Sequence, residues 1–267
     1  MSTIAGVLGP IVSALRDHSG IDFEAFRRST LETAAATRAS VLGVSAEAYL
    51  ARVHSEPRER ALLVEACLVG HTSFFRDIDV MRALANRVFP NVARNVSGVV
   101  RAWVVGAATG EEAWSMAMLL DAAAHQRFDL LATDVSASAL AHAARAEYPT
   151  QILPAGFAEG SFEFDVAVMR VRGELRERVH FAEHDIVGPR LMPASAIVAS
   201  FDVVSCRNVL MWFDERFRRL ALDRLAAVTR PGGVLVLGRS ESLPVNNTSF
   251  VPLADVDAGL RIFERVF

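Results

Sequence analysis

A turn rich in glycine and glutamate follows the apolar run Val99–Val105, which the sequence predicts to be a buried strand. Gly106 and Gly110 bracket the turn, and Glu111 and Glu112 begin a helical pattern directly after it. Glycine lets the backbone approach a ligand closely, and a helix start offers unpaired N–H groups. The spacing is not the G-x-G-x-x-G of a dinucleotide fold, and two adjacent carboxylates would repel a pyrophosphate. A ligand with an ammonium group and no phosphate, such as S-adenosylmethionine, suits the turn better, and a purely structural turn is the alternative.

Polar residues also end three later apolar runs. Asp134 stands where a carboxylate would accept both ribose hydroxyls of a nucleoside, or else cap the next helix. Asp185 stands where a carboxylate would accept the exocyclic amine of adenine, or else lie in a surface turn. Arg207 and Asn208 follow the run that ends at Cys206. Because ligands of parallel sheets gather at the carboxyl ends of the strands, these side chains are predicted to share one edge.

The elements that position these residues follow two patterns. Up to about Phe89 the apolar residues recur every three or four positions, which indicates short helices. After a polar stretch, strand-like and helical runs alternate, which predicts an α/β fold with a doubly wound, mostly parallel Rossmann-like sheet. The expected organisation is an N-terminal all-helical domain at 1–90, a linker to about 98, and a second domain at 99–267 with a small inserted β-subdomain at about 150–190.

Composition excludes several functions. All 28 basic residues are arginine, so the chain lacks the amine needed for a Schiff base or a P-loop. A net charge of −3 argues against nucleic acid as a partner. Two distant cysteines indicate a reduced, cytoplasmic protein, and no apolar run is long enough for membrane insertion. His71, His180 and His184 do not form a convincing set of metal ligands, so no metal is expected.

In order and spacing, the motifs of nearly the whole chain resemble those of the CheR family of chemotaxis receptor methyltransferases. The resemblance implies the class I fold of methyltransferases that use S-adenosylmethionine and release S-adenosylhomocysteine. It also implies methyl transfer to glutamates of chemoreceptors or other signalling proteins, and a monomer. The motifs that carry it are Thr72-x-Phe74-Phe75-Arg76-Asp77, Thr109-Gly110-Glu111-Glu112, Ala132-Thr133-Asp134, Cys206-Arg207-Asn208-Val209-Leu210 with Phe213-Asp214, Pro231-Gly232-Gly233 and Gly238-x-Ser240-Glu241-Ser242.

The resemblance also implies roles for individual residues. Arg76 is expected to orient a carboxylate, and Trp212 stands where the family has a tyrosine at the transfer site. The other residues are expected to hold the cofactor: Thr72 with Arg76 from the N-terminal side, Glu111 with Glu112 and Asp134 at the amino-acid and ribose parts, and Asp185, Ile186, Asn208 and Val209 at the adenine and the far end.

The chain departs from the family pattern at several positions. Gly70 replaces a cofactor-binding asparagine, Trp212 replaces the tyrosine, and Arg239 replaces a histidine. The second N-terminal helix is also only weakly basic. Two alternatives therefore stay open beside chemoreceptor methylation: a different protein or small-molecule acceptor, and a binding module for S-adenosylmethionine or S-adenosylhomocysteine that has lost transfer. A nicotinamide oxidoreductase is disfavoured by the missing third glycine.

Overall fold

The computed structural model describes residues 3–19, 21–68, 72–124, 127–150, 153–157, 160–196, 198 and 200–266. These residues form two compact units. Unit 1 comprises residues 1–69 together with 187–189 and 211–218, and unit 2 comprises the remainder. No helix in the described part of the chain is long and apolar enough to cross a lipid bilayer.

Unit 1 contains short helices that end where the sequence places strong stop and start signals. Gly43 ends one helix in the left-handed conformation, at a φ of 64°, and Ser45 caps the next by accepting a hydrogen bond from the Ala48 N–H. The helices of unit 1 are α1 (Ile4–Ser19), η1 (Phe23–Ala25), α2 (Arg28–Leu42), α3 (Ala46–Ser55) and α4 (Pro57–Cys67).

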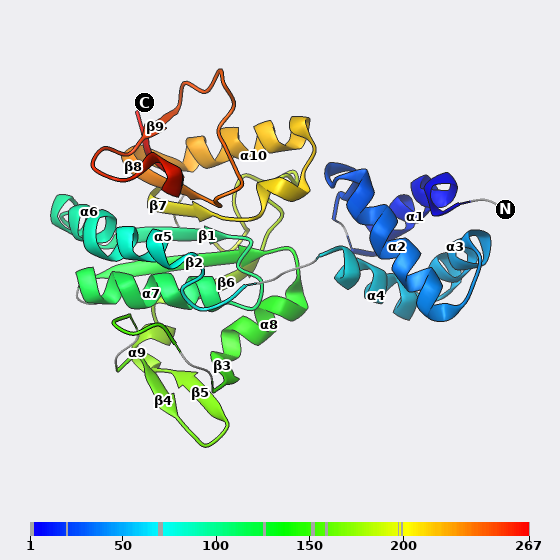
Figure 1. The fold of residues 1–267 in the computed structure, drawn as a ribbon, viewed down its shortest axis with the longest axis horizontal. Coiled ribbons are helices and arrows are strands. Elements are labelled where there is room, and N and C mark those ends of the chain that lie inside the picture. Colours follow the sequence, from blue (N-terminus) through cyan, green and yellow to red (C-terminus); the bar gives the residue numbers. More distant parts are fainter. Residues whose placement is uncertain are drawn as a thin grey trace. The chain divides into compact units, whose positions relative to one another are not determined.

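Unit 2 is built on a seven-stranded sheet with flanking helices (Figure 1). Its order is β6-β2-β1-β7-β8-β10-β9. The first five strands in this order pair in parallel, whereas β10 pairs antiparallel with both β8 and β9. This confirms the predicted doubly wound, mostly parallel sheet. The strands are β1 (Val100–Val105), β2 (Phe128–Asp134), β6 (Val179–Glu183), β7 (Phe201–Cys206), β8 (Thr229–Leu237), β9 (Phe250–Pro252) and β10 (Ile262–Arg265).

The helical segments of unit 2 differ in how they are built. Helix α5 continues through the π-helical turn η2 directly into α6, whereas the others are separate elements. They are α5 (Ile78–Ala83), η2 (Leu84–Val88), α6 (Phe89–Asn95), α7 (Glu111–Ala124), α8 (Ala137–Arg145), α9 (Gly173–Arg176) and η4 (Ala258–Leu260). Helix η3 (Leu210–Trp212) and helix α10 (Glu215–Val228) each contain residues of both units.

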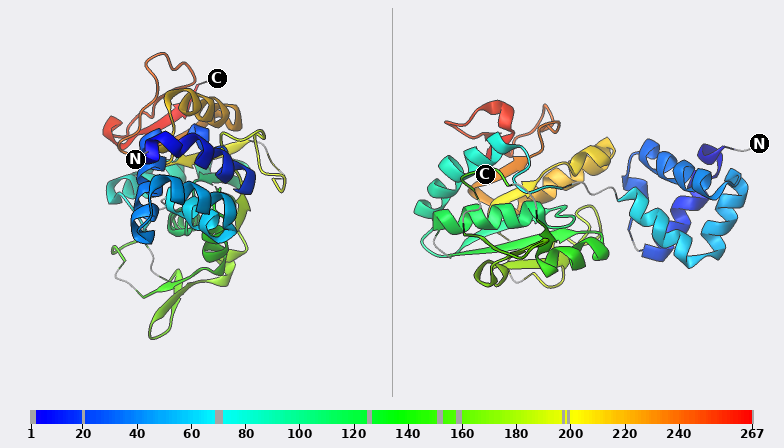
Figure 2. Two further views of the ribbon diagram at one scale, coloured as in Figure 1. Left: turned by 90° about the vertical axis from the view of Figure 1, so that its right-hand side faces the viewer. Right: turned by 60° about the horizontal axis from the view of Figure 1, so that its bottom comes forward.

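A second, three-stranded antiparallel sheet interrupts the alternation. It consists of β3 (Glu147–Pro149), β4 (Phe162–Phe164) and β5 (Val168–Val171) in the order β3-β5-β4. Figure 2 shows its hairpin projecting from the main sheet. The insertion expected at about 150–190 therefore begins three residues earlier, and it ends before Val179 because β6 pairs in parallel with β2 as an edge strand of the main sheet.

The segment before β1 belongs to unit 2, whereas the sequence pattern grouped residues up to about 90 with the N-terminal helices. Phe74, Val80, Met81 and Leu84 are buried in the core cluster that also contains Trp114 of α7. A helical period shows that one face of a helix is apolar, but it does not show which core that face joins. The boundary between the two units accordingly lies near residue 70.

Candidate functional site

The turn after β1 lies at the carboxyl edge of the main sheet, beside the point where the strand order reverses between β1 and β7. Gly106 and Gly110 have φ values of 73° and 97°, in the region that favours glycine. A side chain on Gly106 would collide with a methyl group of Val209, which follows β7. The glycines are therefore required by the local packing as well as by any approach to a ligand.

Asp134 ends β2 with its carboxylate held by the backbone of the same edge. Its Oδ2 accepts a hydrogen bond from the Ala108 N–H at 2.8 Å, and its Oδ1 accepts one from the Ser136 N–H at 2.9 Å. Ser136 itself caps helix α8, so the alternative role of Asp134 as that helix cap does not apply. Burial raises the pKa of Asp134 above its ordinary value. The Val135 N–H is a third backbone donor to this carboxylate, and the role of Asp134 toward ribose hydroxyls stays a prediction.

The two glutamates that begin α7 have separate environments. Glu111 is half-buried and accepts a hydrogen bond from the Thr109 hydroxyl at 2.7 Å. Glu112 is buried, and its two oxygens accept hydrogen bonds from the Ser205 hydroxyl at 2.7 Å and from Arg207 at 3.0 Å. The charge of Glu112 is thus balanced within the protein by Arg207, and its predicted contact with a cofactor stays a prediction.

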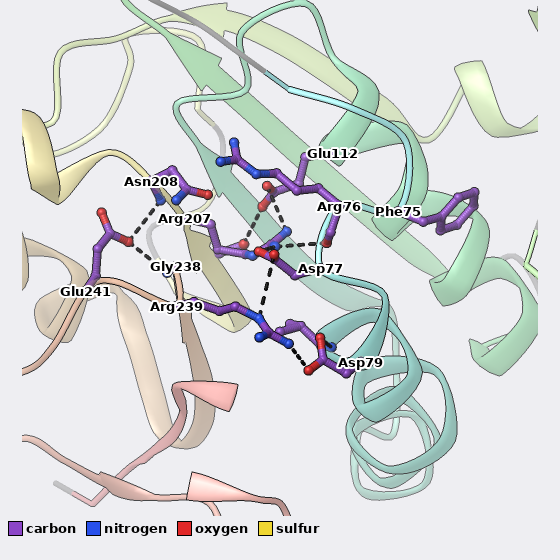
Figure 3. Close-up of polar contacts among 12 residues, drawn as sticks. Phe75, Arg76, Asp77, Asp79, Glu112, Arg207, Asn208, Gly238, Arg239 and Glu241 are labelled. Carbon is purple, nitrogen blue, oxygen red and sulfur yellow. Dashed lines mark hydrogen bonds and ion pairs between the residues drawn. The ribbon is translucent and has the colours of Figure 1, made fainter. Parts of the chain in front are cut away.

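Arg207 joins three segments of the chain through one guanidinium group (Figure 3). Its side chain is fully buried. Besides Glu112, Arg207 donates to Asp77 Oδ2 at 2.6 Å and to the backbone carbonyl of Arg76 at 2.9 Å. Asp77 adopts a left-handed conformation with φ of 57° directly before α5. The buried arginine thus fixes the backbone on which Arg76 stands.

A second arginine contacts the same segment closer to solvent. Arg239, which follows β8, pairs with Asp79, and its Nε lies 3.7 Å from Asp77 Oδ1 (Figure 3). Its side chain is 53% exposed, in contrast to that of Arg207. Sequence reasoning did not identify Asp77 and Asp79 as partners of these arginines. The arginines follow strands more than a hundred residues later in the chain, and local spacing does not show such a contact.

Two side-chain oxygens that the sequence assigns to the site are buried without a hydrogen-bond partner among the described residues: Thr72 Oγ1, in the segment before α5, and Asn208 Oδ1, after β7. Asn208 has a left-handed φ of 60°, and its N–H donates to Glu241 Oε2 at 2.9 Å. Glu241 Oε2 also accepts from the Gly238 N–H at 2.7 Å. A buried polar atom without a partner is costly, so both orphaned oxygens fit a site completed by a polar ligand.

The loop after β6 carries the remaining predicted contacts. The His184 N–H donates to the Asp134 carbonyl at 2.9 Å, which ties this loop to the end of β2. Asp185 is half-buried, Ile186 is buried, and the Ile186 carbonyl accepts a hydrogen bond from Arg224 at 2.7 Å. The structure thus brings Asp134, Asp185 and Ile186 to one edge, and their roles toward a cofactor stay predictions.

Trp212 is held differently from the other predicted site residues. Its carbonyl accepts a hydrogen bond from the Arg27 N–H at 2.8 Å, and the next residue, Phe213, pairs with Phe26. Trp212 belongs to unit 1, whereas Thr72, Arg76 and Asn208 belong to unit 2. Its place at a transfer site stays a prediction. Gly70 lies outside the described residues.

Side chains of the metal-ligating and thiol types also occur in the described part of the chain. No group of three or more histidine, cysteine, aspartate or glutamate side chains is arranged there to hold a metal ion. Cys206, at the end of β7, is buried, and burial raises the pKa of its thiol well above the ordinary value. Buried cysteines in apolar surroundings are typically inert as nucleophiles.

Comparison with known protein families gives one match that spans most of the chain. Residues 70–257 match the model described as CheR methyltransferase, SAM binding domain. The matched range covers the glycine turn, Asp134, Asp185, Arg207 and Asn208.

Individual relatives extend the comparison. The chain is 30% identical over 207 residues to the chemotaxis protein methyltransferase Cher2 of Pseudomonas putida, covering 72% of this chain and 74% of the relative. It is 28% identical over 246 residues to a probable biofilm formation methyltransferase, WspC, of Pseudomonas aeruginosa, covering 90% of this chain and 58% of the relative. It is 32% identical over 250 residues to an uncharacterized 104.1 kDa protein of Rhodobacter capsulatus. That match covers 90% of this chain but only 26% of the much longer relative.

Proposed function

Because the chain belongs to the CheR methyltransferase family, we propose that it transfers a methyl group from S-adenosylmethionine to glutamate side chains of a chemoreceptor or related signalling protein. The observation that carries this proposal is the set of groups at the carboxyl edge of the sheet. There the Asp134 carboxylate is held in place by backbone N–H groups, and Asn208 Oδ1 is buried without a partner among the described residues, as is Thr72 Oγ1 in the segment before α5.

The residues present fit the cofactor that the family uses. Asp134 would accept the ribose hydroxyls, Asp185 with Ile186 would contact the adenine, and Thr72 with Glu111 would contact the amino-acid part. Asn208 and Val209 would line the far end, because the packing of Val209 against Gly106 brings the ends of β1 and β7 together. When bound, S-adenosylmethionine supplies a methyl group on a positively charged sulfur.

The chemistry asks little of the protein beyond alignment. A glutamate side chain has an ordinary pKa of about 4.3, so the acceptor is ionised at neutral pH and no general base is needed. The acceptor oxygen must lie in line with the bond to be broken, at roughly 3 to 3.5 Å from the methyl carbon. Excluding water from the two opposite charges favours the step that cancels them.

Arg76 is the group proposed to orient a carboxylate, either that of the acceptor or that of the cofactor. In Figure 3 its side chain extends from the segment before α5 toward the side of the site where Asn208 lies. A guanidinium group binds a carboxylate through two parallel hydrogen bonds, which sets its direction as well as its position. Arg76→Ala should therefore weaken cofactor binding or turnover, and unchanged values of both would contradict this role.

Trp212 is proposed to face the cofactor's sulfonium group through a cation–π contact, for which tryptophan is the best side chain. The variant Trp212→Tyr tests this role, because it exchanges that contact for a hydroxyl. A large gain in turnover would show that the natural residue impairs transfer. It would favour the alternative that the chain acts mainly as a module that binds the cofactor.

The deciding experiment combines binding and transfer on one sample. The protein is titrated calorimetrically with S-adenosylmethionine and S-adenosylhomocysteine, and is then incubated with labelled cofactor and chemoreceptor-containing membranes. Base-labile methyl release measures carboxyl methylation. Asp134→Asn should lose binding and release together, whereas Asp129→Asn, an exposed carboxylate on the same strand, should retain both.

Each outcome has a distinct meaning. Binding with base-labile release supports the proposal. Binding without release contradicts chemoreceptor methylation and favours another acceptor or a binding module. Absence of binding to both nucleosides contradicts the assignment of the cofactor site itself.

A further inference from the structure

A pocket lies on the side of unit 2 away from the site described above. It has a volume of about 540 Å³ and is formed between the helical run η2–α6 and the antiparallel edge of the sheet. It includes Arg230 to Gly232 at the beginning of β8, whereas the proposed cofactor site follows the end of that strand at Gly238. Figure 1 shows α6 beside the β8 and β9 end of the sheet. A ligand here would not compete with the cofactor.

One wall of this pocket is a helical stripe of cationic and amide groups. Arg87, Asn91, Arg94 and Asn95 are spaced so that they share one face of the helical run. All four are exposed, and the guanidinium groups of Arg87 and Arg94 form no hydrogen bond or ion pair with any residue that the structure describes. Arg87 also lies within the π-helical turn Leu84–Val88, a rare feature that occurs frequently at functional sites.

The opposite wall carries carboxylates. Asp255 comes from the loop after β9, and Glu264 comes from β10. Neither side-chain carboxylate forms a hydrogen bond or an ion pair with a residue that the structure describes. The third arginine of the pocket, Arg230, is already held by Asp202, with Nε at 2.8 Å from Oδ1. The unpaired positive groups therefore come from the helical side and the unpaired negative groups from the sheet side.

Between the two walls the pocket includes Val88, Val92 and Val234, whose side chains are themselves buried. A fitting ligand needs an anionic group for the helical wall, hydrogen-bond donors for the sheet wall, and a body long enough to reach both. Guanidinium forks match phosphate oxygens, and carboxylates accept from the amino group of a base or from ribose hydroxyls. A free amino acid has both charges but is too small for a pocket of about 540 Å³. We propose that this pocket binds a nucleotide through its phosphate, at Arg87 and Arg94.

The test is a calorimetric titration of the full chain, first saturated with S-adenosylhomocysteine so that the cofactor site is occupied. The probes are adenosine 5′-monophosphate, guanosine 5′-monophosphate, adenosine without phosphate, and inorganic phosphate alone. The variant Arg87→Ala/Arg94→Ala removes the two unpaired guanidinium groups. The matched control is Arg82→Ala, which removes an exposed arginine from α5 outside the pocket.

At least one nucleotide should bind the saturated protein with a dissociation constant below about 1 mM, and the double variant should weaken that binding tenfold or more while the control leaves it unchanged. Each removed charge-assisted contact of about 1.5 kcal/mol corresponds to roughly a tenfold loss, so tenfold is the least expected when two contacts are removed. Adenosine and inorganic phosphate should each bind more weakly than the nucleotide.

Three results would overturn the proposal. The first is no nucleotide binding at millimolar concentration, and the second is binding that the double variant does not weaken. The third is equal binding of inorganic phosphate alone, which would make the pocket a simple anion site. Circular dichroism of the double variant shows whether it is folded. Titration with S-adenosylhomocysteine alone, before any nucleotide is added, shows whether the variant still binds the cofactor product.

Discussion

Arg207 is a residue whose consequences for the site can be measured directly. One buried guanidinium group serves the carboxylates of Glu112 and Asp77 and the carbonyl of Arg76. A lysine keeps the positive charge, but a single ammonium cannot reproduce the planar fork that reaches three acceptors. The residue is therefore a positioning group for Arg76 as well as a structural one.

Arg207→Lys should lower the free energy of unfolding by about 2 to 4 kcal/mol, because at least one buried carboxylate loses its partner. It should also weaken cofactor binding, because the backbone of Arg76 is no longer fixed. Urea denaturation gives the first value and calorimetric titration the second. Arg82→Lys, on the exposed surface of α5, is the control. A free energy of unfolding within 0.5 kcal/mol of the wild type would show that Arg207 does not hold the segment.

The raised pKa of Asp134 leads us to expect that cofactor binding depends on pH. Burial raises its pKa in the free protein, and ribose hydroxyls need the ionised form as acceptor. Affinity should thus fall as pH decreases through this raised pKa and should stay level above it. For stability the sign is opposite: the folded pKa exceeds the unfolded one, so this group's contribution is full below the unfolded pKa and is lost as pH rises through the folded pKa.

Titrations between pH 4.5 and 8 with S-adenosylhomocysteine measure this effect, and Asp134→Asn should remove the pH dependence along with most of the affinity. If Asp134→Asn binds S-adenosylhomocysteine as tightly as the wild-type protein does, the ribose role of Asp134 is contradicted.

At the scale of elements, the start of α5 is held by two arginines of unequal burial. Arg239 pairs with Asp79 at the surface, whereas Arg207 pairs with Asp77 in the interior. Exposed ion pairs contribute little and are screened by salt, whereas buried ones are screened much less.

Arg239→Ala should therefore lower the free energy of unfolding by less than about 1 kcal/mol at low salt, with the difference disappearing at 1 M salt. Arg207→Ala should remain strongly destabilising at both salt concentrations. Urea denaturation of the two variants at 0.05 M and 1 M sodium chloride gives the comparison. A large, salt-independent loss in Arg239→Ala would mean that this pair is a structural contact like the buried one.

The elements themselves were predictable to different extents. The apolar runs and the glycine turn correctly predicted the order of strands and helices around β1, β2 and β7, because buried parallel strands leave a strong local signal. The pairing of Glu112 with Ser205 and Arg207 was not predictable, because it joins residues more than ninety positions apart. The membership of α5 and α6 in unit 2 was missed because a helical period does not show which core the apolar face joins.

At the scale of the whole molecule, unit 1 is discontinuous in sequence. The helices before residue 69 are joined by the segment 211–218, in which Phe213 is buried and its ring lies 5.7 Å from that of Phe26, edge to face. The Asp214 N–H also donates to the Ala25 carbonyl, at 3.1 Å. The core of unit 1 therefore depends on residues that follow β7 in the chain.

Phe213→Ala should destabilise unit 1 selectively, by about 3 kcal/mol or more, because it removes a large buried side chain together with its aromatic pair. Hydrogen exchange followed by mass spectrometry should show faster exchange in α1 to α4 than in the wild type. The strands β1, β2 and β7 should exchange as before, because their core is formed within unit 2. Phe217→Ala, a less buried aromatic residue of the same segment, is the matched control. Equal acceleration in both units would show that they unfold together and that the segment 211–218 stabilises the molecule as a single cooperative body.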